Sequence, residues 1–173
     1  FAADIVKIFN RMDEDTLLQF DDIDKCLRDI IYSIKRPEHM LLDLDSTLFG
    51  TYGSQEGEGF NFHYQAHGYH PLLCYDGLTG YLLKAELRDG TLHCSNDADK
   101  FMEPLFQEYL ERGIKTYLRG DSGFSSPRLY KICEMNGCSY AIRLKQNSSL
   151  LALLPIKRKT CTKRPKKIRS VMR

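Results

Sequence analysis

Apolar side chains recur every three to four residues near the start of the chain, which is the spacing of one face of an α-helix. The positions are Phe20, Ile23, Leu27, Ile30, Ile31 and Ile34. Acidic residues precede this stripe, where the helix dipole favours them, and Pro37 ends the pattern. The spacing predicts a helical lead-in over residues 1–37, with its apolar face in the core.

Three segments with the pattern of β-strands follow the helix. The first is HMLLDLDSTLF from His39, the second is the aromatic-rich FNFHYQAHGYHPLLCYDG from Phe60, and the third is GYLLKAELRDG from Gly80. The third alternates apolar and polar residues, and DGLTG before it is typical of a hairpin loop. We therefore expect three antiparallel strands.

The spacing of apolar residues then changes to that of helices. SNDADKFMEPLFQEYLERG predicts a helix that is capped by Ser95 or Asn96 and ends at Gly113, and Pro104 inside it should kink it or shift its start. IKTYLRGDSGF predicts a strand, SSPRLYKICEMNG a short helix capped by Ser126, and SYAIRLK a last strand. The order β-β-β-α-β-α-β predicts an α/β fold with a mixed sheet, in which right-handed crossovers connect the last strands.

Composition adds a class and a boundary. The 173 residues are 42% hydrophobic and 28% charged, which is typical of one globular domain, and no apolar run approaches the ~20 residues of a membrane span. The six cysteines form no Cys-x-x-Cys pair, which favours reduced thiols in the cytoplasm. Residues 1–155 carry a net charge of −7 and residues 156–173 a net charge of +9, so we interpret the latter as a disordered basic tail.

Three aspartates are the candidates for chemistry. Asp43 and Asp45 end an apolar run, and because strand residues two apart share a face, their carboxylates need a cation or a proton between them. Asp121 follows a later apolar strand between glycines. Since active sites of such sheets gather at the carboxyl ends of strands, Asp45 and Asp121 are the predicted pair. Two such acids on adjacent strands suit Mg²⁺, with phosphate oxygens as further ligands.

Other polar and aromatic residues receive structural interpretations. His63, His67 and His70 resemble a zinc set, but a strand would place His70 on the opposite face, so we expect histidines on the sheet surface. The aromatic residues of the same segment are expected to pack across strands rather than to stack on bases; these are Phe60, Phe62, Tyr64 and Tyr69.

The chain resembles the DDE-type transposases of bacterial insertion sequences, which have a ribonuclease H-like catalytic domain. The matching stretches are LLDLDSTLFGTYGSQEGEGFNFHYQAHGYHPLLCYDGLTG, RGDSGFSSPRLY and YAIRLKQN, and NRMDEDTLLQFDDIDK resembles the family's helical lead-in. The resemblance covers most of residues 9–155, and near Leu154 the sequence becomes a basic string. It implies a partial ribonuclease H-like catalytic domain over residues 38–155.

The resemblance also implies residue roles. Asp45 and Asp121 would be the first two catalytic acids and ligands of Mg²⁺ or Mn²⁺, with Asp43 as a supporting acid. The family's third acid, a Glu, has no counterpart, because the sequence contains no Asp or Glu after Glu134. We therefore expect a truncated, inactive transposase, with the catalytic domain incomplete at its C-terminus.

The implied partners are the transposon ends and target DNA in the bacterial cytoplasm, associated with the nucleoid, together with further copies of the chain. Arg119, Arg143 and Lys145, near strand ends, are candidates for contacts with DNA phosphates.

Two alternatives stay open. DLDSTL also fits the opening motif of haloacid dehalogenase-type phosphatases, with Asp43 as nucleophile and Asp45 as general acid. Those enzymes need a further acid after Gly120-Asp121 and a helix after the first motif, neither of which the sequence predicts. The other alternative is a non-catalytic DNA-binding remnant, in which the basic tail contacts phosphates without sequence preference.

Overall fold

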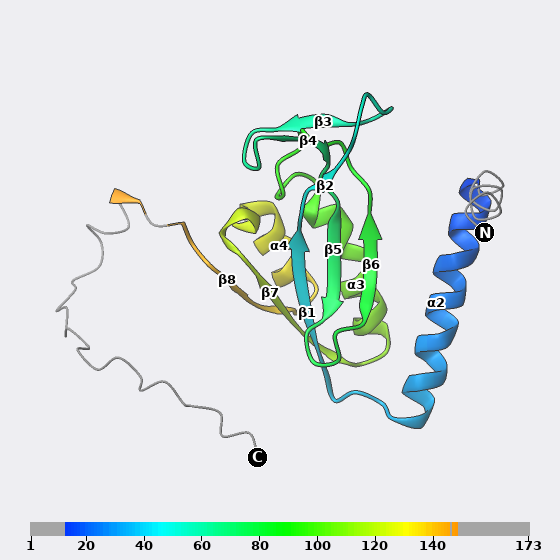
Figure 1. Ribbon diagram of the computed structural model, residues 1–173. Helices are drawn as coiled ribbons and strands as arrows, with labels where there is room; N and C mark the ends of the chain where they lie inside the picture. The colour runs from blue at the N-terminus through cyan, green and yellow to red at the C-terminus, as the bar shows by residue number, and fades with distance from the viewer. Residues whose placement is uncertain (1–12, 146, 149–173) are drawn as a thin grey trace, which may run out of the picture.

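A five-stranded mixed sheet forms the body of the chain in the computed structural model, which describes residues 13–145 and 147–148 (Figure 1). The strand order is β6-β5-β1-β7-β8. The strands are β1 (His39–Ser46), β5 (Leu72–Asp76), β6 (Leu82–Glu86), β7 (Lys115–Gly120) and β8 (Ser139–Ile142). β5 pairs antiparallel with β1 and β6, whereas β1, β7 and β8 run parallel. The main sheet thus consists of three antiparallel strands, β1, β5 and β6, and two further strands, β7 and β8, that run parallel to β1. This arrangement confirms the predicted ribonuclease H-like order.

The hydrophobic core lies between this sheet and two helices, α3 (Ala98–Glu111) and α4 (Pro127–Met135), on one of its faces. Even-numbered residues of β1, such as Leu42 and Leu44, are buried there. The helices contribute further fully buried side chains, which include Phe101, Met102, Phe106, Tyr109 and Leu129. Odd-numbered residues of β1 lie on the opposite face, which carries the aspartates.

The predicted long second strand is wrong, because the segment from Phe60 folds as three strands. They are β3 (Gly59–Asn61), β4 (Ala66–Tyr69) and β5, and the first two join β2 (Phe49–Gly50) in a separate sheet of order β2-β4-β3. A tight turn at residues 62–65 reverses the chain between β3 and β4, and Gln65 in it has a left-handed φ of 54°. Figure 1 shows the three-stranded sheet beyond the carboxyl end of β1.

The predicted lead-in helix is present as α2 (Glu14–Ile34), which begins with a capping box between Asp13 and Thr16. Its apolar stripe is exposed, so the prediction that this face is core is wrong; Phe20 is 50% and Ile34 82% exposed. The helix contacts the body through its other face instead. The Tyr32 and Tyr109 hydroxyl oxygens are 3.1 Å apart, and Arg28 Nη1 donates to the Leu83 carbonyl at 3.1 Å. In Figure 1 most of α2 stands clear of the sheet.

The ends of the two core helices follow the predicted signals with one exception. The residue at the N-cap of α3 is Asp97 rather than Ser95 or Asn96, and Pro104 lies inside the helix without ending it. Ser126 caps α4 by accepting from Leu129 N at 3.3 Å, as predicted. Chain reversal after α3 uses Gly113 in a left-handed conformation, with φ of 66°.

The basic segment 156–173 and the predicted domain boundary at residue 155 lie outside the described residues. Among the helices that are described, none combines the length and the apolar character that a bilayer crossing requires.

Candidate active site

The two predicted catalytic acids lie at the same end of the main sheet, where β1 and β7 have their carboxyl ends. β1 and β7 are parallel neighbours, and their register pairs Leu44 with Gly120. Asp45 and Asp121 are the next residues along the two strands, so the fold brings together carboxylates that are 76 positions apart in the sequence. Asp121 is exposed at the start of a 3-10 helix, Ser122–Phe124, and Asp45 is exposed near the end of β1.

Backbone amides orient both carboxylates. Asp45 Oδ1 accepts from the Ser46 amide at 2.8 Å, and Asp121 Oδ1 accepts from the Gly123 amide at 2.8 Å. No described residue donates a hydrogen bond to the Oδ2 atom of either aspartate. In each carboxylate one oxygen is thus held by a backbone amide, and the other accepts no hydrogen bond from the described residues.

Asp43 has a different environment from Asp45, although both lie on the open face of the sheet. Arg119 stands opposite it in the β1–β7 register and binds it with two hydrogen bonds: Nε donates to Oδ1 at 2.7 Å, and Nη2 donates to Oδ2. The hydrogen bond to Asp43 raises the pKa of the Arg119 guanidinium, and the charge of Asp43 raises it further. Asp43, the predicted supporting acid, and Arg119, one predicted phosphate contact, are therefore paired with each other.

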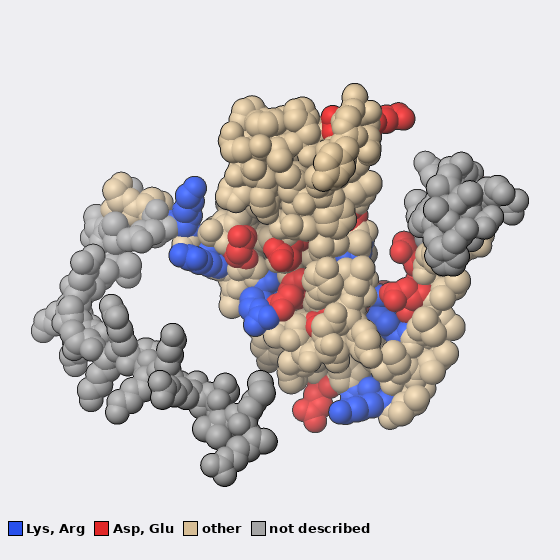
Figure 2. Space-filling model, in the orientation of Figure 1, with Lys and Arg blue, Asp and Glu red and all other residues tan. Residues whose placement is uncertain are grey.

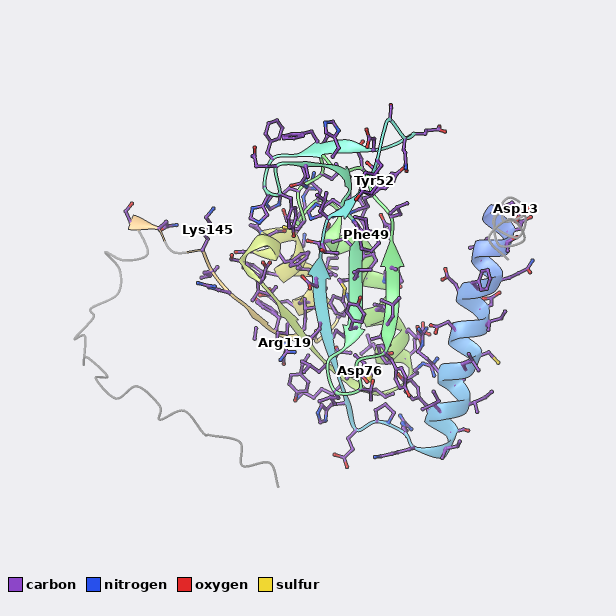
Figure 3. All side chains as sticks on the ribbon, viewed as in Figure 1. Asp13, Phe49, Tyr52, Asp76, Arg119 and Lys145 are labelled. Atoms are coloured by element: carbon purple, nitrogen blue, oxygen red, sulfur yellow. The ribbon has the colours of Figure 1, made fainter. Side chains whose placement is uncertain are left out.

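The other two predicted DNA contacts follow the carboxyl end of β8. The Arg143 amide donates to the Gly120 carbonyl at 3.3 Å, which places Arg143 beside the residue that precedes Asp121. Lys145 lies farther along the same exposed segment (Figure 3). Figure 2 shows acidic and basic side chains side by side on this face, below the three-stranded sheet.

Two residues of the site were missed by the sequence analysis. The Tyr64 hydroxyl lies 3.5 Å from the carbonyl oxygen of Ser46, and burial raises the pKa of Tyr64, with further contributions from the charges of Asp45, Cys94 and Asp121. The pKa of the Cys94 thiol is also raised, first by burial and then by Asp121. Neither residue belongs to a motif with the aspartates, so local sequence spacing gives no signal for them.

The three histidines that resemble a zinc set occupy separate environments. His70 is buried, and its Nδ1 lies 2.7 Å from the Leu92 carbonyl oxygen. His67 Nδ1 is 3.6 Å from Glu58 Oε1, and His63 packs edge-on against Tyr64 with ring centroids 4.9 Å apart. Within the described residues, no group of three or more His, Cys, Asp or Glu side chains is placed to hold a metal ion.

The aspartate pair nevertheless fits part of a magnesium or manganese site. Mg²⁺ takes oxygen ligands and is commonly held by one or two carboxylates, with water and substrate phosphate as the remaining ligands. Asp45 and Asp121 supply two such carboxylates on adjacent strands, and both are open to solvent. The donor set therefore suits a metal ion that binds together with a phosphate group.

The geometry opposes the phosphatase alternative. In that interpretation Asp43 is the nucleophile, but both of its carboxylate oxygens accept hydrogen bonds from Arg119. The chain after β1 also enters β2 and the three-stranded sheet rather than a helix.

The strand order and the positions of the acids define a ribonuclease H-like domain with aspartates at the carboxyl ends of β1 and β7, which are the first and fourth strands of the main sheet along the chain. The chain belongs to the family described as transposase DDE domain group 1, whose model matches residues 2–172. The match continues through the basic segment, beyond the point near Leu154 at which the sequence analysis placed the end of the resemblance.

The solved structures that are similar to the chain include a transposase complex and an integrase domain. A piggyBac transposase synaptic complex with hairpin DNA has a TM-score of 0.49 and 19% identity over 79% of this chain and 31% of that one. The catalytic core domain of BIV integrase has a TM-score of 0.42 and 14% identity over 67% of this chain and 61% of that one. This chain therefore spans less than two thirds of either protein chain. Among curated protein sequences, none matches.

Proposed function

We propose that this chain provides two of the catalytic acids of a DDE transposase, which cleaves and transfers DNA strands with a divalent metal ion. The observation that supports the proposal is the register of β1 and β7, which pairs Leu44 with Gly120, the residues that directly precede Asp45 and Asp121. Membership of the transposase DDE family supports the assignment. The catalytic domain would comprise residues 38–155, and the DNA substrates would be transposon ends and target DNA.

In this proposal each described group has a defined task. The Ser46 and Gly123 amides hold one oxygen of Asp45 and Asp121, and the other oxygen of each would be a ligand for the metal ion. A bound Mg²⁺ or Mn²⁺ ion would supply Lewis-acid stabilisation of an in-line phosphoryl displacement. Arg143 and Lys145 would contact neighbouring phosphates, and Arg119 could do so only after leaving Asp43.

The third acid limits what this chain is expected to do alone. The family resemblance places the third acid, a Glu, beyond the last strand of the sheet. The given sequence contains no Asp or Glu after Glu134, so it offers no residue for that role. We therefore expect residues 1–173, tested on their own, to bind a metal ion in the presence of DNA but to cleave strands slowly, because they supply two of the three acids.

The first test is Mn²⁺ binding, measured by the electron paramagnetic resonance signal of the free ion in the presence of duplex DNA. Replacing a ligand carboxylate by an amide removes a charge, so Asp45→Asn and Asp121→Asn should each weaken binding about tenfold or more. Glu38→Gln is the matched control, because Glu38 is an exposed acid that directly precedes the amino end of β1, far along the strand from Asp45. Wild-type Mn²⁺ affinity in both aspartate variants would overturn the metal assignment.

Activity is tested with the same variants. Supercoiled DNA nicking that depends on Mg²⁺ or Mn²⁺ and is lost in both aspartate variants would show a working site. Hydrolysis of p-nitrophenyl phosphate that depends on Asp43 would instead favour the phosphatase alternative. We expect slow nicking at most and no phosphatase activity.

A further inference from the structure

The turn at residues 62–65 carries exposed aromatic side chains, and one of them, Tyr64, reaches the residue that follows Asp45. It connects β3 to β4 in the three-stranded sheet, beyond the carboxyl end of β1 (Figure 1). The sequence analysis expected the aromatic residues of this segment to be packed, and this holds for Phe60, which lies edge-on to His67 at 5.2 Å between ring centroids. It also holds in part for Phe62, which lies edge-on to Phe60 at 5.2 Å, and for Tyr64, which lies edge-on to His70 at 5.9 Å between ring centroids. Both side chains nevertheless stay largely open to solvent, at 79% and 42% exposed.

The turn is fixed by the buried side chain of Asn61, which is only 5% exposed. Its Nδ2 donates to the Gly90 carbonyl at 2.7 Å, and its Oδ1 accepts from the His63 and Tyr64 amides at 3.0 and 3.2 Å. Gln65 closes the turn with a side-chain hydrogen bond to the Phe62 carbonyl. Phe62 and Tyr64 therefore project from a backbone that is already ordered, which lowers the entropic cost of binding a ligand.

Tyr64 lies within reach of the candidate active site. Its hydroxyl is 3.5 Å from the carbonyl oxygen of Ser46, the residue that follows Asp45. Burial is the main cause of the raised pKa of Tyr64, and the negative charges of Asp45 and Asp121 contribute to it. A DNA strand with its phosphate at the aspartates would bring a neighbouring base to this turn.

We propose that Phe62 and Tyr64 bind an unpaired nucleobase next to the phosphate that is cut. This inference rests on the proposed function. The sequence of the turn, Phe-His-Tyr-Gln, carries no acid that would repel DNA. Aromatic faces stack on any base, whereas bases inside a duplex already stack on each other, so the site selects unpaired nucleotides.

The test uses a duplex with a short unpaired 3′ tail that contains 2-aminopurine, whose fluorescence falls on stacking, and a fully paired duplex for comparison. EDTA is present, so the result does not depend on the metal site. Wild type should quench the tail and bind the tailed DNA more tightly than the paired duplex. Phe62→Ala and Tyr64→Ala should each weaken tail binding at least about fivefold and reduce the quenching, with duplex affinity unchanged.

The controls separate stacking from other effects. Tyr64→Phe keeps the ring and should bind the tail like wild type. Tyr81→Ala removes an exposed tyrosine in the β5–β6 hairpin, at the opposite end of β5, and should also have no effect. Circular dichroism and Mn²⁺ binding of each variant report on the fold and on the aspartates. Phe62 is largely exposed, so Phe62→Ala remains informative if Tyr64→Ala does not fold.

The result that would overturn the proposal is equal tail binding by wild type, Phe62→Ala and Tyr64→Ala, or an equal loss for tailed and paired DNA. If Mn²⁺ binding fails while aromatic-dependent tail binding persists, the metal assignment is wrong and the base site stands. If Mn²⁺ binds as expected while tail binding is unaffected by the aromatic variants, the base site is wrong and the metal assignment stands.

Discussion

Two aspartates that are two residues apart on β1 have different electrostatic environments. Asp43 stands opposite Arg119, which donates to both of its carboxylate oxygens. Asp45 lies two residues nearer the carboxyl end of β1, where its Oδ1 accepts a hydrogen bond from the Ser46 amide. A carboxylate that is already paired with an arginine is less available as a metal ligand, which supports the proposal that Asp45, and not Asp43, would hold the metal ion.

At the same scale, Gly68 and Gly50 face each other in the β2–β4 register but differ in the space around them. A Cβ on Gly68 would collide with the backbone carbonyl of Phe49, whereas a Cβ on Gly50 meets nothing nearer than the His67 oxygen at 4.0 Å. Gly68→Ala should therefore lower the free energy of unfolding by about 1–3 kcal/mol. Gly50→Ala should change it little.

Urea denaturation of both glycine variants provides the measurement. Equal stability of Gly68→Ala and Gly50→Ala would show that β2 can move away from β4 without cost, which would contradict the close strand approach.

At the scale of elements, α2 has its apolar stripe on the face that points away from the body. Leu27 and Ile30 are 55% and 53% exposed, whereas Phe101 of α3 is 2% exposed. Glutamine has a good helix propensity and both positions are exposed. Leu27→Gln and Ile30→Gln should therefore each change the free energy of unfolding by less than about 0.5 kcal/mol. Phe101→Ala should lower it by about 3–5 kcal/mol.

Chemical denaturation of these three variants distinguishes an exposed stripe from a buried one. A loss for Leu27→Gln that approaches the loss for Phe101→Ala would mean that the stripe is covered in solution.

At the scale of the whole molecule, α2 is joined to the body by Tyr32 and Tyr109. Burial is the main cause of the raised pKa of both phenols, and in Tyr109 the hydrogen bond to Tyr32 raises it further. The folded state therefore keeps protons that the unfolded chain loses near the ordinary tyrosine pKa of about 10. The stabilising contribution is complete below that pH and is lost as the pH rises above it.

Tyr109→Phe should consequently flatten the alkaline fall in stability. It should also cost about 1 kcal/mol at neutral pH, since one hydrogen bond of a buried hydroxyl is removed. Urea denaturation at a series of pH values measures both effects. Tyr81→Phe, at an exposed position, is the control and should follow the wild type. An unchanged alkaline slope in Tyr109→Phe would contradict the assignment.

The sequence by itself determined the order along the chain of the main-sheet strands and helices, and the positions of Asp45 and Asp121 at strand ends. These features follow from local periodicity and from capping or turn residues such as Ser126 and Gly113, whose effects act within a few positions.

Only the tertiary structure decided the pairing of Asp43 with Arg119, the position of Tyr64 beside the aspartates, and the orientation of the α2 stripe away from the body. The split of the aromatic segment into two sheets belongs here too. The physical reason is that these features depend on contacts between residues far apart in the chain, such as the 76 positions between Asp43 and Arg119. Periodicity identifies an apolar face, but sheet register and helix docking decide what that face contacts.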